Sequence, residues 1–153
     1  PASISVIGKG AFAGCTALQS LTIPFVGSAR DAEGEAALLG RLFSDTQMSG
    51  CTLVYKYYSE YGMTAAYIPD SLTEVIVTDA ETIGYGAFSS VTTLQRVSIT
   101  ANILGERAFY DCVSLAEVEL RAGMTAIGQS AFARCLAEGR DPRFRADGRQ
   151  ICF

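Results

Sequence analysis

The stretch Ile7–Ile23, IGKGAFAGCTALQSLTI, is the first of four copies of one pattern. The later copies begin at Ile83, Leu104 and Ile127. The pattern is (Ile/Leu)-Gly-x-x-Ala-Phe-x-x-Cys-x-x-Leu-x-x-(Val/Leu)-x-(Ile/Leu), although Val91 replaces the cysteine once and the last copy lacks its second half. Self-similarity with a period of about 20 to 50 residues is the signature of a repeat solenoid. The pattern therefore predicts a chain that winds through stacked, similar turns.

Each copy combines a strand-like half with a turn-like half. Leu21 and Ile23 alternate on one face of a short strand. Phe12 and Cys15 have the i, i+3 spacing of a single helical or 3-10 turn with one apolar side. Gly8 precedes that turn, where a residue free to adopt unusual backbone angles is favoured. One copy cannot bury both apolar faces alone, so neighbouring copies must stack and share a continuous core.

Stacking is expected to bury the phenylalanine and cysteine positions of the pattern. These structural core residues are Phe12, Phe43, Phe88, Phe109, Phe132, Cys15, Cys112 and Cys135. The three cysteines are expected to form one buried file of small, soft side chains. Cys51 and Cys152 fall outside this file and are the more reactive pair by expectation.

The repeated pattern resembles the BspA-like leucine-rich repeats of bacterial surface proteins, which also occur in some protists. The resemblance is close over residues 7–23 and 72–135 and loose over 24–71 and 136–153. It implies an α/β repeat solenoid: a right-handed leucine-rich-repeat superhelix with a short parallel sheet on one face and short helical or 3-10 turns on the other. It also implies adhesion or recognition rather than catalysis.

The whole chain, 1–153, is expected to form a single leucine-rich-repeat domain. It is typical of a fragment of a longer array, because intact solenoids need polar end caps. The repeats are expected at about 4–24, 36–78, 80–100, 101–121 and 124–153. The last repeat includes a terminal hairpin around Asp147-Gly148, a strong turn signal.

The repeat at 36–78 is degenerate and carries an inserted β-hairpin at about 48–69. Between Phe43 and Leu72 lie 28 residues, where a regular copy has five. Two strand-like runs, 52–58 and 64–68, flank a link that contains Gly62, which is typical of a hairpin. Insertions of this kind form loops on one face of a solenoid and often carry binding.

Five of the seven tyrosines lie in the insertion: Tyr55, Tyr57, Tyr58, Tyr61 and Tyr67. Tyrosine supplies a large contact area with a polar handle and is enriched at interaction hot spots. The rings either cover the solenoid or face a ligand. Alternation puts Tyr55 and Tyr57 on one side of the strand and Lys56 and Tyr58 on the other, so both roles can hold.

The outward positions of the stacked strands form a second candidate surface. If the strands stack in register, Glu74, Arg96 and Glu117 form a ladder of alternating charge. Cross-strand pairs of opposite charge contribute roughly 0.2–1 kcal/mol each, so the ladder supports register more than it indicates a ligand site. A flat polar strip could also serve for adhesion.

Composition excludes several classes of function. The chain is 49% hydrophobic and 18% charged, which indicates a folded body, and its net charge of −4 offers no footprint for nucleic acid. No run approaches the 18 or more apolar residues of a membrane helix. The chain has no histidine, so Ser-His-Asp and Cys-His arrangements are absent and a zinc site is disfavoured. We expect no enzyme, cofactor or metal.

The leading hypothesis is a non-enzymatic recognition or adhesion module, extracellular or on a bacterial cell surface. Its partner would be a host matrix protein or another surface protein. One alternative is carbohydrate binding, with tyrosines of the insertion stacked on sugar rings. Another is a structural spacer that presents other domains.

Overall fold

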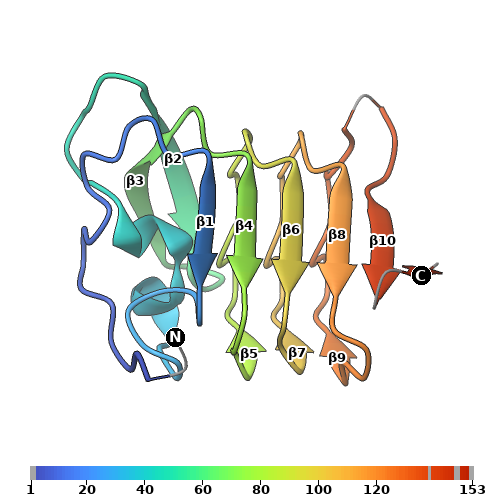
Figure 1. The fold of residues 1–153 in the computed structure, drawn as a ribbon. Coiled ribbons are helices and arrows are strands. Elements are labelled where there is room, and N and C mark those ends of the chain that lie inside the picture. The colour runs from blue at the N-terminus through green and yellow to red at the C-terminus, as the bar shows by residue number, and fades with distance from the viewer. Residues whose placement is uncertain (1–2, 138, 147–148, 152–153) are drawn as a thin grey trace.

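The computed structural model describes residues 3–137, 139–146 and 149–151. Short strands form one six-stranded sheet along the front of the molecule (Figure 1). In spatial order they are β1 (Ser20–Ile23), β4 (Glu74–Val77), β6 (Arg96–Ile99), β8 (Glu117–Leu120), β10 (Arg143–Ala146) and β11 (Arg149–Ile151). The first five are parallel, and β11 returns antiparallel to β10. Because each of the parallel strands lies beside the next one of the chain, the molecule is a stack of turns.

Alternation of side chains explains why these short segments are strands. Leu21, Val75, Val97 and Val118 occupy equivalent register positions on β1, β4, β6 and β8, and all four are buried. β-branched residues suit such a pleated, half-buried surface. Burying each side chain contributes roughly 1.5–3 kcal/mol. The outward positions between them stay polar, apart from Ile76, as the two-residue period requires.

A second parallel sheet, which the sequence analysis did not anticipate, runs along one lower edge. It consists of β5 (Thr82–Ile83), β7 (Ile103–Leu104) and β9 (Ala126–Ile127), and these strands precede the glycine of each copy (Figure 1). The expectation of unusual backbone angles is wrong, because Gly8, Gly105 and Gly128 all lack a positive φ; in the last two copies the glycine is needed for close approach, although Gly8 has open space around it. A Cβ at Gly105 would lie 2.6 Å from the Ile83 carbonyl oxygen, and one at Gly128 would lie 2.4 Å from the Glu106 nitrogen.

The phenylalanines stack along the solenoid as the pattern predicts. The Phe88 and Phe109 rings are 4.6 Å apart between centroids and nearly parallel, and Phe132 follows at 5.3 Å. Phe144 of β10 closes the row with an edge contact to Phe132 at 4.8 Å. At the other end Phe12 is tilted against the buried Phe43 at 6.2 Å. Phe12 and Phe132 are only half-buried, whereas Phe43, Phe88 and Phe109 are buried as expected.

Helical structure is confined to the degenerate copy within the described ranges. It comprises the 3-10 helices η1 (Gly34–Ala37) and η2 (Leu39–Leu42). In the regular copies the same part of the chain forms hydrogen-bonded turns that are linked to the next copy. The Phe88 N–H, for example, donates to the Ala108 carbonyl at 2.7 Å. Bonds of this kind between copies alternate with turn bonds within a copy, such as the one from the Ser89 N–H to the Gly86 carbonyl at 2.9 Å.

The expectation that Cys15 shares a buried file with the other pattern cysteines is wrong. Cys112 and Cys135 are buried, and each thiol donates to the carbonyl of the preceding copy's phenylalanine: Phe88 at 3.1 Å and Phe109 at 2.9 Å. Cys15, in the copy at residues 7–23, is exposed.

The prediction that Cys51 and Cys152 are the more reactive cysteines is not tested by the structure. Cys51 is half-buried, and Cys152 lies outside the described residues, so their reactivity stays a prediction. The Asp147-Gly148 turn also lies outside them, although the β10 and β11 strands that it joins are paired.

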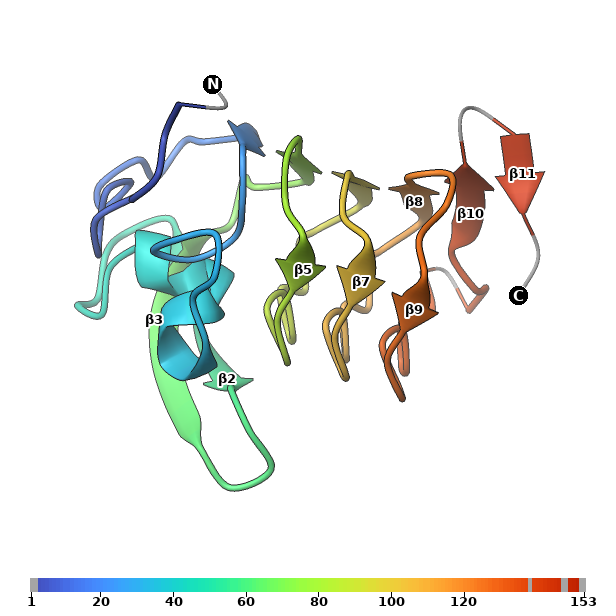
Figure 2. The same ribbon diagram turned by 90° about the horizontal axis from the view of Figure 1, so that it is seen from below.

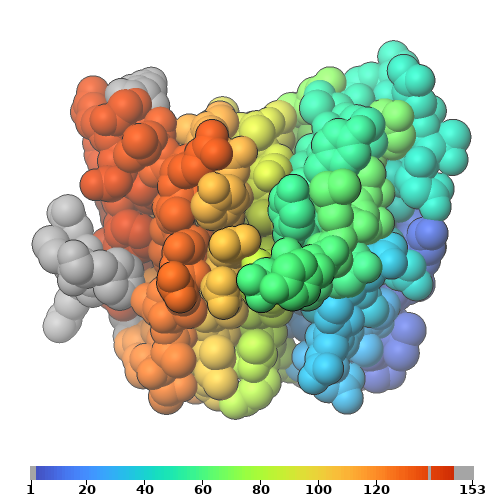
Figure 3. All heavy atoms as spheres, turned by 180° about the vertical axis from the view of Figure 1, so that it is seen from behind, coloured from blue at the N-terminus to red at the C-terminus, as the bar shows by residue number. Residues whose placement is uncertain are grey.

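The insertion forms an antiparallel pair, β2 (Cys51–Tyr57) and β3 (Met63–Pro69). Figures 2 and 3 show it behind the front sheet, raised over the back of the solenoid, with its tip reaching away from the core. One face of the pair is part of the hydrophobic core, through Val54, Ala66 and Ile68. The core therefore fixes the hairpin's orientation.

Candidate binding surface on the inserted hairpin

The opposite face of the hairpin is exposed and apolar. Tyr55 is 56% exposed, Tyr57 is 48% exposed, and Tyr61 at the tip is 91% exposed. Leu53 and Met63 are exposed beside them, and Tyr57 pairs directly with Met63 across the two strands. We call these five residues the hairpin outer face. It results from the two-residue period of strands whose other side is anchored in the core.

The remaining two tyrosines of the insertion lie at backbone hydrogen bonds that hold the hairpin in place. Tyr58 N–H donates to the Gly62 carbonyl at 3.0 Å, and a Cβ at Gly62 would collide with the Tyr58 ring, so this ring lies over the turn. Tyr67 N–H donates to the Ser44 carbonyl at 2.8 Å, which ties β3 to the chain beside Phe43. The structure thus divides the five predicted tyrosines into three exposed ones and two half-buried ones.

Lys56 is completely buried beneath the hairpin, which its charge alone would not suggest. Its Nζ donates to the Ser89 carbonyl at 2.8 Å, and burial lowers its pKa to about 8. In the next copy the equivalent carbonyl, that of Tyr110, accepts a backbone N–H from Ser90. The lysine therefore supplies the donor that the degenerate copy lacks at this point.

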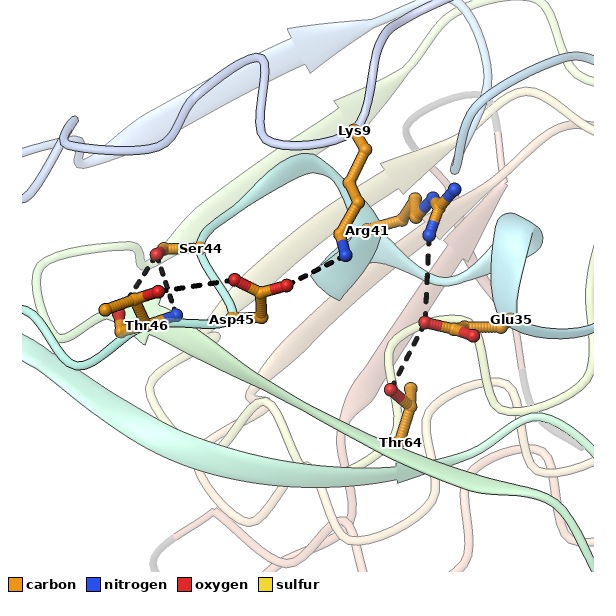
Figure 4. A network of polar contacts seen from close by, with 7 residues as sticks. All are labelled: Lys9, Glu35, Arg41, Ser44, Asp45, Thr46 and Thr64. Atoms are coloured by element: carbon orange, nitrogen blue, oxygen red, sulfur yellow. Dashed lines mark hydrogen bonds and ion pairs between the residues drawn. The ribbon is translucent and has the colours of Figure 1, made fainter.

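A polar network joins the first copy, the degenerate copy and the hairpin (Figure 4). Lys9 donates to Asp45 at 2.8 Å, and this contact lowers the pKa of the Asp45 carboxyl. Glu35 lies 3.7 Å from Arg41 and accepts a hydrogen bond from Thr64 of β3 at 3.3 Å. Exposed pairs of this kind contribute little to stability. Because these charges are paired with one another, this edge of the hairpin is a poor candidate for a ligand site.

A row of tyrosine and arginine side chains runs over the turns of the regular copies. The Arg107 guanidinium lies 6.0 Å from the Tyr85 ring centroid and 5.8 Å from that of Tyr110. Arg134 lies 5.8 Å from the Tyr110 centroid and forms an ion pair with Asp111 at 3.2 Å. We call Tyr85, Arg107, Tyr110 and Arg134 the turn-face row. Cation–π contacts at exposed sites contribute about 0.5–1 kcal/mol each.

The turn-face row begins beside the hairpin. A Cβ at Gly86 would collide with the Tyr57 carbonyl oxygen, so the end of β2 rests on the residue that follows Tyr85. The sequence analysis missed Tyr85 and Tyr110, the two tyrosines outside the insertion. The sequence did contain a sign of this row, because both tyrosines fall at variable positions of the turn in successive copies.

The outward ladder on the front sheet has the predicted register. Glu74 pairs with Arg96 at 3.2 Å, Arg96 with Glu117 at 3.3 Å, and Glu117 with Arg145 at 3.3 Å. Ser20 extends the row with a hydrogen bond to Glu74 at 2.9 Å. Each charge of the ladder already has a partner within it. This arrangement stabilises the alignment of the strands and leaves little unpaired charge for a ligand.

No group of three or more potential metal-ligating side chains gathers among the residues that the structure describes. The same part of the chain contains no helix with the length and apolar character needed to span a membrane.

The stacked parallel strands and repeated turns define a repeat solenoid, a class of protein that typically serves as a non-enzymatic binding scaffold. The family model of the BspA type leucine rich repeat region matches residues 1–29 and 55–138 in six copies. More than half of the chain is matched, so the protein belongs to this family, as the repeated pattern predicted. No curated relative and no solved structure matches it. Membership supports a protein-interaction or surface-type module.

Proposed function

We propose that this module binds a protein partner through the hairpin outer face and the adjoining turn-face row. The observation that carries the proposal is the exposure of Tyr55, Tyr57 and Tyr61 on strands whose opposite side is fixed in the core. Exposed apolar patches mark interaction sites, and tyrosine and arginine are enriched among the residues that dominate binding energy. A surface held rigid before binding loses less entropy when it binds.

Backbone strain in the turn-face row supports the same surface. Arg107 and Arg134 have positive φ angles of 53° and 63°, whereas the first copy has Gly10 and Gly14 at these two positions. The left-handed conformation costs a residue with a side chain roughly 1–2 kcal/mol. Strained conformations of this kind cluster at functional sites. The copies that begin at Leu104 and Ile127 carry arginine side chains at these positions despite the cost.

The proposal places the module outside the cell or on a bacterial cell surface, with a host matrix protein or another surface protein as its partner. It includes a right-handed winding of the solenoid, which is the hand that parallel crossover connections strongly favour. Glu74, Arg96 and Glu117 on the strand face are a weaker candidate for the contact surface than the hairpin outer face, because they are paired with one another. Carbohydrate binding by the same tyrosines and a spacer role are the alternatives that the experiment separates.

The test is a binding screen of the intact chain against extracellular-matrix proteins and a glycan panel. The variant Tyr55→Ser with Tyr57→Ser removes the centre of the hairpin outer face. A matched control, Val6→Ser with Leu136→Ser, removes two exposed apolar side chains elsewhere. Circular dichroism and thermal melts first establish that all three proteins are folded.

We expect the tyrosine variant to lose binding to a protein of the panel while the control keeps it. Unchanged binding by the tyrosine variant would overturn the proposal and direct attention to the strand face. Binding to glycans alone would favour the carbohydrate alternative. If the intact chain binds nothing, the spacer role is favoured.

A further inference from the structure

A hollow of about 420 Å³ near the C-terminal end of the stack takes no part in the proposed surface. It lies between the loops that precede β6 and β8 and the connection that leads into β10. Val113, Ala116 and Ala137 supply apolar lining, and Gln95, Arg140 and Arg143 supply polar lining. Sites for small molecules commonly enclose about 300–1,000 Å³.

The hollow exists because the last copy loses its second half. In the preceding copy Leu115, three residues after Cys112, is completely buried and leads directly into β8. Three residues after Cys135 the sequence has Glu138 instead, so the last copy lacks this core leucine. The chain then follows a different path and returns to the stack where the Arg143 N–H donates to the Ala116 carbonyl at 2.8 Å. The space that a regular copy fills is left open, and the apolar wall of the previous loop is uncovered.

Arg140 and Arg143 differ from the other arginines whose side chains the structure describes. Each of the others has an ion pair or a side-chain hydrogen bond; they are Arg30, Arg41, Arg96, Arg107, Arg121, Arg134 and Arg145. Arg140 and Arg143 have neither with any described residue, and both line the same hollow. Asp141 also lines it, which leaves a surplus of one positive charge among the lining residues.

We propose that this hollow is a binding site for the carboxylate of a small organic acid. A guanidinium presents a planar fork of donors that matches a carboxylate, and charge-assisted bonds of this type are about twice as strong as neutral ones. Arg140 and Arg143 hold the carboxylate, and the Gln95 amide adds an uncharged donor. Val113, which is 43% exposed, and Ala116 contact the apolar body of the acid. The site is independent of the hairpin outer face and of any protein partner.

Isothermal titration at low salt with benzoate and with D-glucuronate tests the proposal, and benzamide and D-glucose serve as uncharged counterparts. The variant Arg140→Gln with Arg143→Gln removes the two arginines that line the hollow. The control, Arg121→Gln with Lys9→Gln, makes the same change in net charge at exposed positions away from the hollow. Thermal melts check that each variant is folded.

We expect the intact chain to bind one of the two acids at millimolar concentration and the Arg140/Arg143 variant to bind it about tenfold or more weakly, since two charge-assisted contacts are lost. The control variant should bind within a factor of about two of the intact chain. Binding of benzoate alone or of glucuronate alone would support the site and identify the body of the acid as aromatic or as a sugar. No binding of either acid, equal weakening in the control, or equal binding of the uncharged counterparts would overturn the proposal.

Discussion

Replacement of the buried lysine, Lys56→Met, gives a sharp test of how the hairpin docks on the solenoid. The Lys56 side chain is completely inaccessible, and its burial lowers its pKa to about 8. In the unfolded chain the same group has its ordinary pKa of about 10.4. Between these two values the unfolded chain binds more protons than the folded chain, so the free energy of unfolding rises with pH. Below pH 8 the lysine is protonated in both states and contributes no slope.

The magnitude follows from the size of the shift. A full proton of difference changes the free energy of unfolding by about 1.4 kcal/mol per pH unit, so the interval from pH 8 to 10.4 amounts to about 3 kcal/mol. Burial raises the pKa of the Cys112 thiol, and this makes stability fall as pH rises in the upper part of the same interval. The wild type and the Lys56→Met variant both keep Cys112, so the effect of burial on this thiol cancels in the difference between their stabilities, and the charge interaction between Lys56 and Cys112 remains in it.

Urea unfolding of both proteins at several pH values from 7 to 10.5 measures this difference. We expect it to be constant below pH 8 and then to change in favour of the wild type by about 3 kcal/mol at the top of the range. Lys9→Met, which removes an exposed lysine, is the control and should show no such change. A flat difference for Lys56→Met would refute the reasoning, because it would mean that the lysine is hydrated and that the hairpin is not docked as described.

Three other predictions test the stack and its surface. Phe109→Ala should lower the free energy of unfolding by about 3–5 kcal/mol, and Phe12→Ala, at a half-buried ring with one neighbour, should lower it less in the same urea melts; equal losses would contradict the stacking. A thiol reagent should label exposed Cys15 in the native protein and buried Cys112 only after unfolding, as mass spectrometry of the labelled chain would show; early labelling of Cys112 would contradict its burial. Arg96→Met should lower the free energy of unfolding in urea by no more than about 1 kcal/mol, because the ion pairs of Arg96 are exposed. A decrease of several kcal/mol would mean that the ladder stabilises the sheet far more than exposed ion pairs normally do.

The regular part of the fold could be predicted because every copy repeats the same constraint. Phe88, Phe109 and Phe132 recur at nearly equal spacing, and only stacking in register buries each of them against the next. The same register brings Glu74 beside Arg96 without any further assumption. A periodic pattern specifies which strands lie side by side as well as the local structure of each. For this reason the strand pairing could be predicted from the sequence.

The irregular part could not be predicted, because its contacts depend on tertiary context. Nothing local distinguishes Lys56 from a solvated lysine, and its burial follows from an acceptor 33 residues later in the chain. Cys15 is exposed, although it follows the same Ala-Phe-x-x-Cys pattern as the buried Cys112 and Cys135. The need for glycine at Gly105 likewise comes from the adjacent copy and not from its own backbone angles.

Part of the candidate surface could be predicted from the sequence, and part could not. Alternation along one strand correctly separated Tyr55 and Tyr57 from Lys56. The link between Tyr85, Arg107 and the hairpin required knowing that the insertion folds back over the copies that follow it. Pattern analysis treats the variable positions of a repeat as unimportant, yet in this fold they form a large part of the exposed surface.

The residues with positive φ angles carry a consequence for how this protein can diversify. Ser90, Arg107, Asp111, Ser130 and Arg134 recur at two fixed places in successive turns, and none of them is part of the hydrophobic core. Exchanges among them alter the surface while the stacked rings and strands stay unchanged. Each new side chain carries the same backbone cost as the one it replaces, so selection can act on surface chemistry with little effect on stability. A library randomised at these five positions would therefore sample new specificities on an intact scaffold, and lineages of this repeat could have done the same by drift.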